Sequence, residues 1–137
     1  MTQKVVLENK ISSIQKYLAV LGRYKTLTRK EIVDNLDTRG ATERYLYLVV
    51  QSAIDLSAAV ISYKKFRKPT TFSEGFTILM ENGLISKELE DSLVKMTGFR
   101  NILAHGYENV DYDVMYDVLQ NRLEDIKSFA FQMEKVE

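Results

Sequence analysis

Residues 43–66 read ERYLYLVVQSAIDLSAAVISYKKF, and this stretch decides the fold class. Its apolar residues cover most of the circumference of a helix, and the polar residues midway along it are Gln51, Ser52, Asp55 and Ser57. A helix that is apolar nearly all round is a buried one, so we expect it to lie at the centre of the fold or against a partner. Its longest unbroken apolar run, YLYLVV, is too short to cross a bilayer.

Three further amphipathic helices are predicted around this central one. The first has the apolar stripe Leu7, Ile11, Ile14, Leu18 and Leu21. Another has the stripe Leu89, Leu93, Met96, Phe99 and Leu103. The last carries Val114, Val118 or Leu119, Ile126, Phe129 or Ala130, and Met133. Four long helices with short connections predict an all-α fold, an antiparallel four-helix bundle.

The connections are expected to hold one or two short helical pieces and several turns. Residues 28–36 (TRKEIVDNL) indicate a short helical turn, residues 37–42 (DTRGAT) a connection, and residues 108–113 (ENVDYD) a turn. Pro69 marks the break after the central helix.

Capping signals define two of the shorter boundaries. Thr71 with Glu74 three residues later has the form of a capping box, and it predicts an extra short helix that Asn82 and Gly83 close. Ser86 is expected to cap the helix that follows.

The composition is that of an ordered globular protein. With 137 residues, 45% of them hydrophobic, the chain can bury a real core, and we expect one domain over residues 1–137. The absence of cysteine excludes disulfides and thiolate chemistry and suits the cytoplasm, and the first ten residues lack the apolar run of a signal peptide. The net charge of zero gives no global electrostatic argument for nucleic-acid binding.

The stretch GFRNILAHGY, residues 98–107, holds the only histidine of the chain. It can be read as an ordinary helix end, where the macrodipole favours His105 and Gly106 supplies a left-handed residue. It can also be read as a site. Residues five apart on a helix diverge by about 140°, but Arg100 is long and His105 directly precedes a glycine. Both side chains could therefore face one pocket, and a dimer would combine two copies of it.

The chemistry that such a pair supports is limited. One histidine without cysteine cannot build a His/Cys zinc site, and no acidic cluster has the spacing of a magnesium site. Metal-free work on phosphate remains. An imidazole can take a proton from an RNA 2′-hydroxyl near neutral pH. Arg100 can hold the phosphate with two hydrogen bonds. Asn101 could orient the imidazole or bind the same oxygen.

The stretch RNILAHGY resembles the R-N-x-x-x-H-x-Y signature of the HEPN superfamily, and within it the HepT-like toxins. Arg100, Asn101, His105 and Tyr107 each fall on a motif position, and the length and all-helical pattern agree along the whole chain. The resemblance implies a homodimer of four-helix bundles whose two motifs meet in a cleft and cleave RNA without metal or cofactor. Arg100, Asn101 and His105 would be its catalytic residues.

The resemblance also implies a type II toxin–antitoxin pair, in which a minimal nucleotidyltransferase is the antitoxin and can transfer AMP to Tyr107. AMP there would place a phosphate beside Arg100 and His105 and compete with RNA for the guanidinium. Without the resemblance, Tyr107 is simply an aromatic residue at a helix end.

A basic cluster in RYKTLTRK, residues 23–30, is a weaker candidate for RNA binding. It consists of Arg23, Lys25, Arg29 and Lys30. If the long helices alternate in direction, this cluster lies at the same pole of the bundle as the motif, and KKFRK, residues 64–68, lies at the opposite pole. Asp55 either contacts the site or fills a buried polar gap.

Two other functions remain open at the level of sequence. One is a non-catalytic helical subunit that binds substrate for a nucleotidyltransferase, and the other is a plain dimerisation module. The intact motif favours the ribonuclease, because a scaffold has no chemical need for both Arg100 and His105.

Overall fold

The computed structural model describes residues 2–137, without the side chain of Tyr107. Its elements are α1 (Gln3–Tyr24), α2 (Arg29–Val33), α3 (Leu36–Lys64), α4 (Glu74–Glu81), α5 (Lys87–His105), the 3-10 turn η1 (Tyr107–Asn109), α6 (Tyr112–Asp117), the π-helical turn η2 (Val118–Arg122) and α7 (Leu123–Glu134). Within residues 2–137 every regular element is helical, so the all-α prediction is confirmed.

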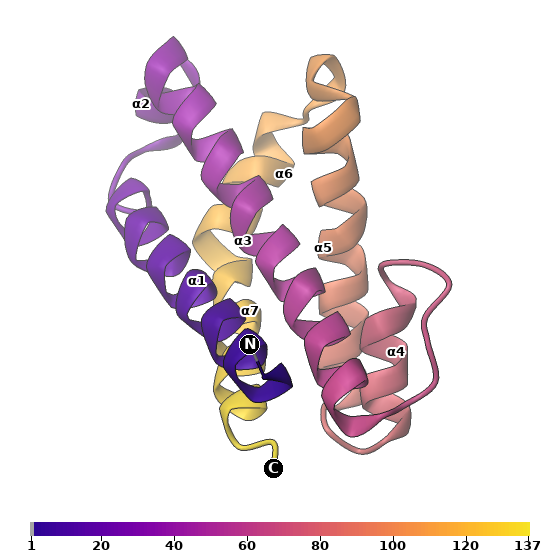
Figure 1. Cartoon of the computed structure of the whole chain (residues 1–137). Coiled ribbons are helices and arrows are strands. Elements are labelled where there is room, and N and C mark those ends of the chain that lie inside the picture. Colours follow the sequence, from indigo (N-terminus) through magenta and orange to yellow (C-terminus); the bar gives the residue numbers. More distant parts are fainter. Residues whose placement is uncertain (1) are drawn as a thin grey trace.

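The long helices form an antiparallel bundle (Figure 1). In that view α1 and α5 run upward, while α3 and the run from α6 to α7 run downward, and both termini lie at the lower end. Hydrogen bonds from Lys4 to the Val136 carbonyl (3.0 Å) and from Lys64 to the Glu137 carbonyl (2.9 Å) tie the chain ends to that pole. The predicted four-helix bundle is therefore confirmed.

Helix α3 is the central element, as its composition predicts, and packs on α1, α5, α4, α7 and α2. It is also longer and more apolar than the YLYLVV run suggests. By length and composition α3 could cross a membrane, but 56% of its most apolar window is buried inside the bundle. Packing against the other helices thus accounts for its apolar surface.

The prediction of a connection over residues 37–42 is wrong, because these residues belong to α3. Asn35 caps the helix by accepting a hydrogen bond from the Thr38 N–H (3.0 Å). Thr42 is fully buried and bonds back to the Thr38 carbonyl (2.7 Å), and Gly40 stands at an uncrowded, exposed position. The extension adds about two turns and carries α3 alongside the end of α5.

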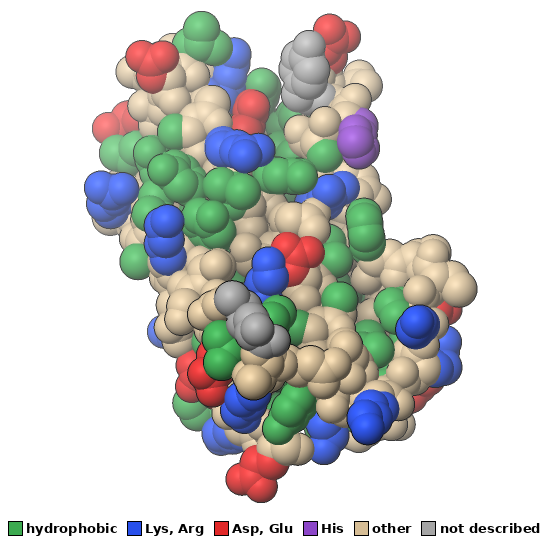
Figure 2. Space-filling view, in the orientation of Figure 1, with side chains coloured by type: hydrophobic (Ala, Val, Ile, Leu, Met, Phe, Trp, Pro, Cys, Tyr) green, Lys and Arg blue, Asp and Glu red, His purple; other side chains and the backbone are tan. Residues whose placement is uncertain are grey.

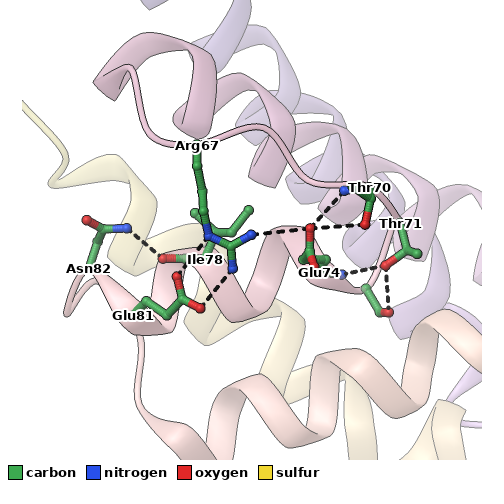
Figure 3. A network of polar contacts seen from close by, with 8 residues as sticks. Arg67, Thr70, Thr71, Glu74, Ile78, Glu81 and Asn82 are labelled. Carbon is green, nitrogen blue, oxygen red and sulfur yellow. Dashed lines mark hydrogen bonds and ion pairs between the residues drawn. The ribbon is translucent and has the colours of Figure 1, made fainter.

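Figure 3 shows the start of α4. The Thr71 hydroxyl accepts from the Glu74 N–H (3.1 Å), which is one bond of the predicted capping box, but α4 itself begins only at Glu74 and is preceded by Ser73 rather than Thr71. The return bond differs, because the Glu74 carboxylate accepts from the Thr70 N–H (2.8 Å) rather than from Thr71. Arg67 holds the same carboxylate at 3.4 Å and also pairs with Glu81 at 2.8 Å. The loop before α4 is therefore tied to α4 along its length.

The ends of α4 and α5 agree with the sequence in two places and differ in one. Gly83 takes a positive φ of 75° after α4, and Ser86 caps α5 through the Leu89 N–H (3.1 Å), both as predicted. Gly106 is not left-handed, since its φ is −130° and its N–H completes the helix on the Ile102 carbonyl (2.8 Å). The chain continues from there into η1, so no reversal is needed.

The last predicted helix is interrupted. The expected turn at residues 108–113 contains η1 and the first residues of α6, which Asp111 caps, and η2 then separates α6 from α7. Beside this wider π turn, Gln120 donates to the Lys25 carbonyl (2.9 Å) and Tyr116 to the Leu27 carbonyl (3.2 Å). The chain after the motif is thus fastened to the loop between α1 and α2.

Candidate active site between α3 and α5

Arg100 is the best-held residue of the motif. It lies on the side of α5 that meets α3, and only 8% of it is exposed. Each guanidinium nitrogen donates one hydrogen bond: Nε to Gln51 Oε1 (2.8 Å), Nη1 to Asn101 Oδ1 (2.9 Å) and Nη2 to the Tyr47 hydroxyl (3.2 Å). All three acceptors are neutral. The guanidinium is therefore fixed in direction while its charge remains available for an anion.

Two aromatic rings flank this guanidinium. The centre of the Tyr47 ring lies 5.0 Å from Arg100 Cζ, and that of the Phe72 ring lies 5.4 Å away. Both distances are within the range of cation–π attraction. Tyr47 comes from α3, whereas Phe72 comes from the loop before α4 and is 53% exposed.

A relay of side chains stands behind Arg100. Gln51 Oε1 faces Arg100, and Gln51 Nε2 donates to Asp55 Oδ1 (2.9 Å). Asp55 in turn pairs with Lys10 of α1 at 3.6 Å. A carboxylate only accepts hydrogen bonds, so Asp55 orients the Gln51 amide with its oxygen toward Arg100. Asp55 thus acts on the site through Gln51 rather than by direct contact.

Two of the groups that hold Arg100, Tyr47 and Gln51, belong to one polar face of α3. Arg44, Tyr47, Gln51 and Asp55 follow one another at gaps of three, four and four residues, and we call them the polar stripe of α3. Residues at this spacing share one side of a helix. This spacing is present in the sequence, but the apolar residues around it predict a buried helix rather than a site.

His105 is exposed at the end of α5 and borders a cavity of about 420 Å³. The cavity is lined by Gly40, Glu43, Arg44, Tyr47, Leu103, Ala104 and His105. Figure 2 shows the histidine, in purple, on the surface near the upper end of the molecule. Tyr47 contacts Arg100 and also lines this cavity, so it links the two residues. An anion at Arg100 and a proton acceptor at His105 would then serve one bound group.

The comparisons with known proteins bear on this arrangement. Residues 8–133 match the family model described as Ribonuclease HepT-like. The chain belongs to this family. A tRNA nuclease HepT of Aphanizomenon flos-aquae is 25% identical over 131 residues, which cover 96% of this chain and 89% of that protein. An mRNA nuclease HepT of Shewanella oneidensis is 34% identical over 79 residues, covering 58% of this chain and 59% of that protein.

Solved structures agree on the fold. A toxin–antitoxin complex with AMP-PNP matches with a TM-score of 0.87 at 24% identity, covering 94% of this chain and 97% of that one. The tri-AMPylated HEPN toxin of Shewanella oneidensis in complex with its MNT antitoxin matches with a TM-score of 0.80 at 24% identity, covering 94% and 96%. The family match and the two nuclease relatives confirm the sequence-based prediction of a HepT-like ribonuclease, and the solved structures confirm its fold.

The structure gives Asn101 of this HepT-like ribonuclease a more definite setting than the sequence does. Asn101 accepts from Arg100 rather than orienting the imidazole, so it holds the guanidinium. Tyr107 follows directly on Gly106 in η1, but its side chain lies outside the described part of the chain.

The predicted basic cluster stands at the pole of the motif but apart from the cavity. In Figure 1 the end of α1, all of α2 and the end of α5 lie at the upper end of the molecule. The end of α3, with KKFRK, lies at the lower end. Arg29 is paired with Asp113 of α6 (2.7 Å), and Lys30 with Asp34 (3.7 Å). Lys25 lines a separate cavity between α1 and α7.

Arg44 is the cation that lies closer to the motif. It borders the cavity beside His105, and its guanidinium carbon lies 5.3 Å from the centre of the Tyr47 ring. Sequence analysis missed it because no run of basic residues surrounds it.

Within residues 2–137, no three His, Cys, Asp or Glu side chains gather closely enough to hold a metal ion.

Proposed function

We propose that this protein is a metal-independent endoribonuclease toxin of a type II toxin–antitoxin pair and that Arg100, Asn101 and His105 form its catalytic site. The observation that carries the proposal is the buried Arg100, held by three neutral acceptors beside the cavity that His105 borders. A fixed, uncompensated guanidinium is suited to a phosphodiester. The HepT nucleases named above are relatives that cut tRNA and mRNA.

The reaction needs no nucleophile from the protein. A 2′-hydroxyl of the RNA attacks the adjacent phosphorus, and His105 takes its proton as general base or, as general acid, protonates the departing 5′-oxygen. Arg100 binds the non-bridging oxygens, whose charge grows in the transition state. The bond from phosphorus to the 5′-oxygen breaks, leaving a 2′,3′-cyclic phosphate on one fragment and a 5′-hydroxyl on the other.

A homodimer completes the proposal. The face seen in Figure 2 carries the histidine and, over the upper parts of α1 and α3, a broad apolar area. Three partly buried tyrosines contribute to the surface of these helices: Tyr17, Tyr24 and Tyr45. The ring centre of Tyr45 lies 6.2 Å from that of Tyr17 and 6.4 Å from that of Tyr24. A second copy that covers this surface would bring two sites close together.

The antitoxin would be a nucleotidyltransferase that acts on Tyr107. The related Shewanella toxin is described as tri-AMPylated and in complex with an MNT antitoxin. Tyr107 is two residues from His105, so an added phosphate there would oppose RNA binding at Arg100 by charge and bulk. Such a pair would work in the cytoplasm.

The test uses protein expressed without a partner, total cellular RNA and an excess of EDTA. Wild-type protein is expected to produce fragments that end in 2′,3′-cyclic phosphate, and an Arg100→Ala/His105→Ala variant is expected to produce none. Intact mass first confirms that Tyr107 carries no AMP. Absence of cleavage by unmodified wild-type protein would contradict the proposal and favour a non-catalytic helical subunit of a nucleotidyltransferase.

A second assay addresses the antitoxin. Incubation with the cognate nucleotidyltransferase and ATP should add the mass of AMP to the wild type but not to Tyr107→Phe, and should stop cleavage only by the wild type. Addition to Tyr107→Phe as well would place the modification at another residue.

A further inference from the structure

Phe72 is an unusual residue for its position. It is among the few large apolar side chains that are more than half exposed, at 53%. Its ring centre lies 5.4 Å from Cζ of Arg100, whose own side chain is buried. An exposed aromatic ring beside a buried, oriented cation suits a ligand that has both an apolar face, which packs on the ring, and a negative charge, which pairs with the cation.

The loop that carries Phe72 is held on both sides of the residue (Figure 3). Before it, the Thr70 N–H and hydroxyl bond to the Glu74 carboxylate at 2.8 and 3.3 Å. The Thr71 hydroxyl, immediately before Phe72, accepts from the N–H of Glu74, which follows Phe72 in the chain, at 3.1 Å. Arg67 braces the same carboxylate. The ring therefore stands on an anchored loop, where little ordering entropy is lost on binding.

Phe72 and the His105 cavity approach Arg100 from different elements. The cavity is built by α3 and the end of α5, with Tyr47 as its link to the guanidinium, whereas Phe72 reaches the guanidinium from the loop before α4. A phosphate at Arg100 would thus have one attached nucleotide near His105 and the other near Phe72. The ring offers no hydrogen-bonding group, so it can stack on a base without reading its edge.

We propose that Phe72 is a stacking platform for an unpaired nucleobase next to the phosphate held by Arg100. The proposal rests on the ribonuclease function proposed above. It assigns to the loop before α4 a role in binding single-stranded RNA, with tolerance for base identity.

The first test uses the absence of tryptophan from the chain. Phe72→Trp and Phe131→Trp each introduce a single indole, and Phe131 is a matched control because it is a 57% exposed phenylalanine on α7, beside the cavity between α1 and α7. Each full-length variant is titrated with a 12-nucleotide 2′-O-methyl oligouridylate, which cannot be cleaved, and with the same oligonucleotide lacking its bases. Only Phe72→Trp with the base-bearing oligonucleotide should show quenched fluorescence.

The second test measures cleavage of a single-stranded RNA that spans a site mapped in the total-RNA digest. Phe72→Leu should reduce kcat/KM about tenfold, and Phe72→Tyr should keep it near that of the wild type. An abasic residue on the Phe72 side of the scissile phosphate should cause the same loss in the wild type and no further loss in Phe72→Leu.

The outcomes separate the two proposals. Cleavage by the wild type with equal responses of Phe72→Trp to both oligonucleotides would overturn the platform and leave the ribonuclease intact. Losses that multiply in the abasic substrate would assign Phe72 to holding Arg100 instead. A response of Phe72→Trp to the antitoxin alone would make the loop a protein contact. No cleavage by unmodified wild-type protein would remove the ribonuclease proposal itself.

Discussion

A buried arginine without a carboxylate partner is costly to the fold, because burial penalises the charged group. In this chain the cost is offset by Gln51, Asn101 and Tyr47, each of which accepts from one nitrogen of Arg100. Local departures of this kind are expected at functional sites. Arg100 thus carries a feature that packing alone does not require.

Gln51 is predicted to position the guanidinium of Arg100 for catalysis. Gln51→Leu should lower kcat about tenfold, because Arg100 loses the acceptor that orients its Nε–H, while the KM for RNA changes less. In NMR spectra the Nε–H of Arg100 should exchange faster with solvent. Gln15→Leu, which removes an amide bonded to Glu134 (2.8 Å), is the matched control. Equal effects of the two substitutions would deny Gln51 a positioning role.

The sequence predicted the catalytic candidates but not their supports. Arg100, Asn101 and His105 stand out because they occur together around the only histidine. Gln51 and Phe72 come from distant parts of the chain, and their role depends on which face of α3 meets α5 and on the path of one loop. A single sequence does not contain that information.

At the scale of elements, local chemistry predicted the boundaries well where a cap was present. The cap of α5 by Ser86 and the bond between Thr71 and Glu74 can be predicted from sequence because the two groups that bond are close neighbours along the chain. The start of α3 was missed because Gly40 and its polar neighbours resemble a turn, while the deciding contact is the burial of Thr42. The π turn η2 likewise depends on packing between α6 and the loop after α1.

The close packing of α4 on α3 is predicted to depend on the glycine at position 75. A Cβ added at Gly75 would lie 2.7 Å from Oγ of the buried Ser57. Gly75→Ala should therefore lower the free energy of unfolding by about 1–3 kcal/mol through overpacking. Ser57→Ala should recover part of that loss in the double variant. Urea unfolding of both single variants and the double variant measures the coupling, and additive effects would refute the close contact.

At the scale of the molecule, the four long helical segments followed from apolar periodicity and their antiparallel order from the short connections between them. The single hydrophobic core explains why this pattern was sufficient, since each stripe faces the same interior. How two bundles meet does not follow from periodicity, because the surface for a partner and the surface for the core are both apolar. Tyr45 is one of the partly buried residues that pack against the core at the surface of the bundle.

Tyr45 gives the prediction for assembly. Tyr45→Arg adds a charge to the apolar area over α1 and α3 and should convert a homodimer into a monomer with little RNA cleavage. Sedimentation measures the mass, and circular dichroism checks that the bundle remains folded. Phe131→Arg, at an exposed phenylalanine of α7, is the control that should remain a dimer. A monomeric wild-type protein with full activity would contradict the proposed assembly.

Acid pH should weaken the bundle. The hydrogen bond from Lys87 (2.6 Å) lowers the pKa of the carboxyl of Glu90, a residue that is only 3% exposed. A lowered folded pKa stabilises the fold above the unfolded value, about 4.3, and this contribution disappears as the pH falls through the folded value.

Urea unfolding between pH 7 and pH 3 measures this effect. Glu90→Gln should be less stable at pH 7 and should lose less stability than the wild type below about pH 4.3. Glu88→Gln removes an exposed charge from the same helical turn and serves as the control. Parallel pH curves for the wild type and Glu90→Gln would rule out Glu90 as a source of the acid sensitivity.

The most direct test of the central claim is the single-turnover rate of RNA cleavage in EDTA by wild-type protein and Arg100→Lys. Lysine keeps the charge, but it cannot make the three directed bonds to Gln51, Asn101 and Tyr47. If the oriented guanidinium stabilises the transition state, Arg100→Lys should be slower by about a hundredfold or more while its thermal unfolding shows a folded bundle. A rate for Arg100→Lys equal to that of the wild type, or activity of the wild type that disappears in EDTA, would contradict the account.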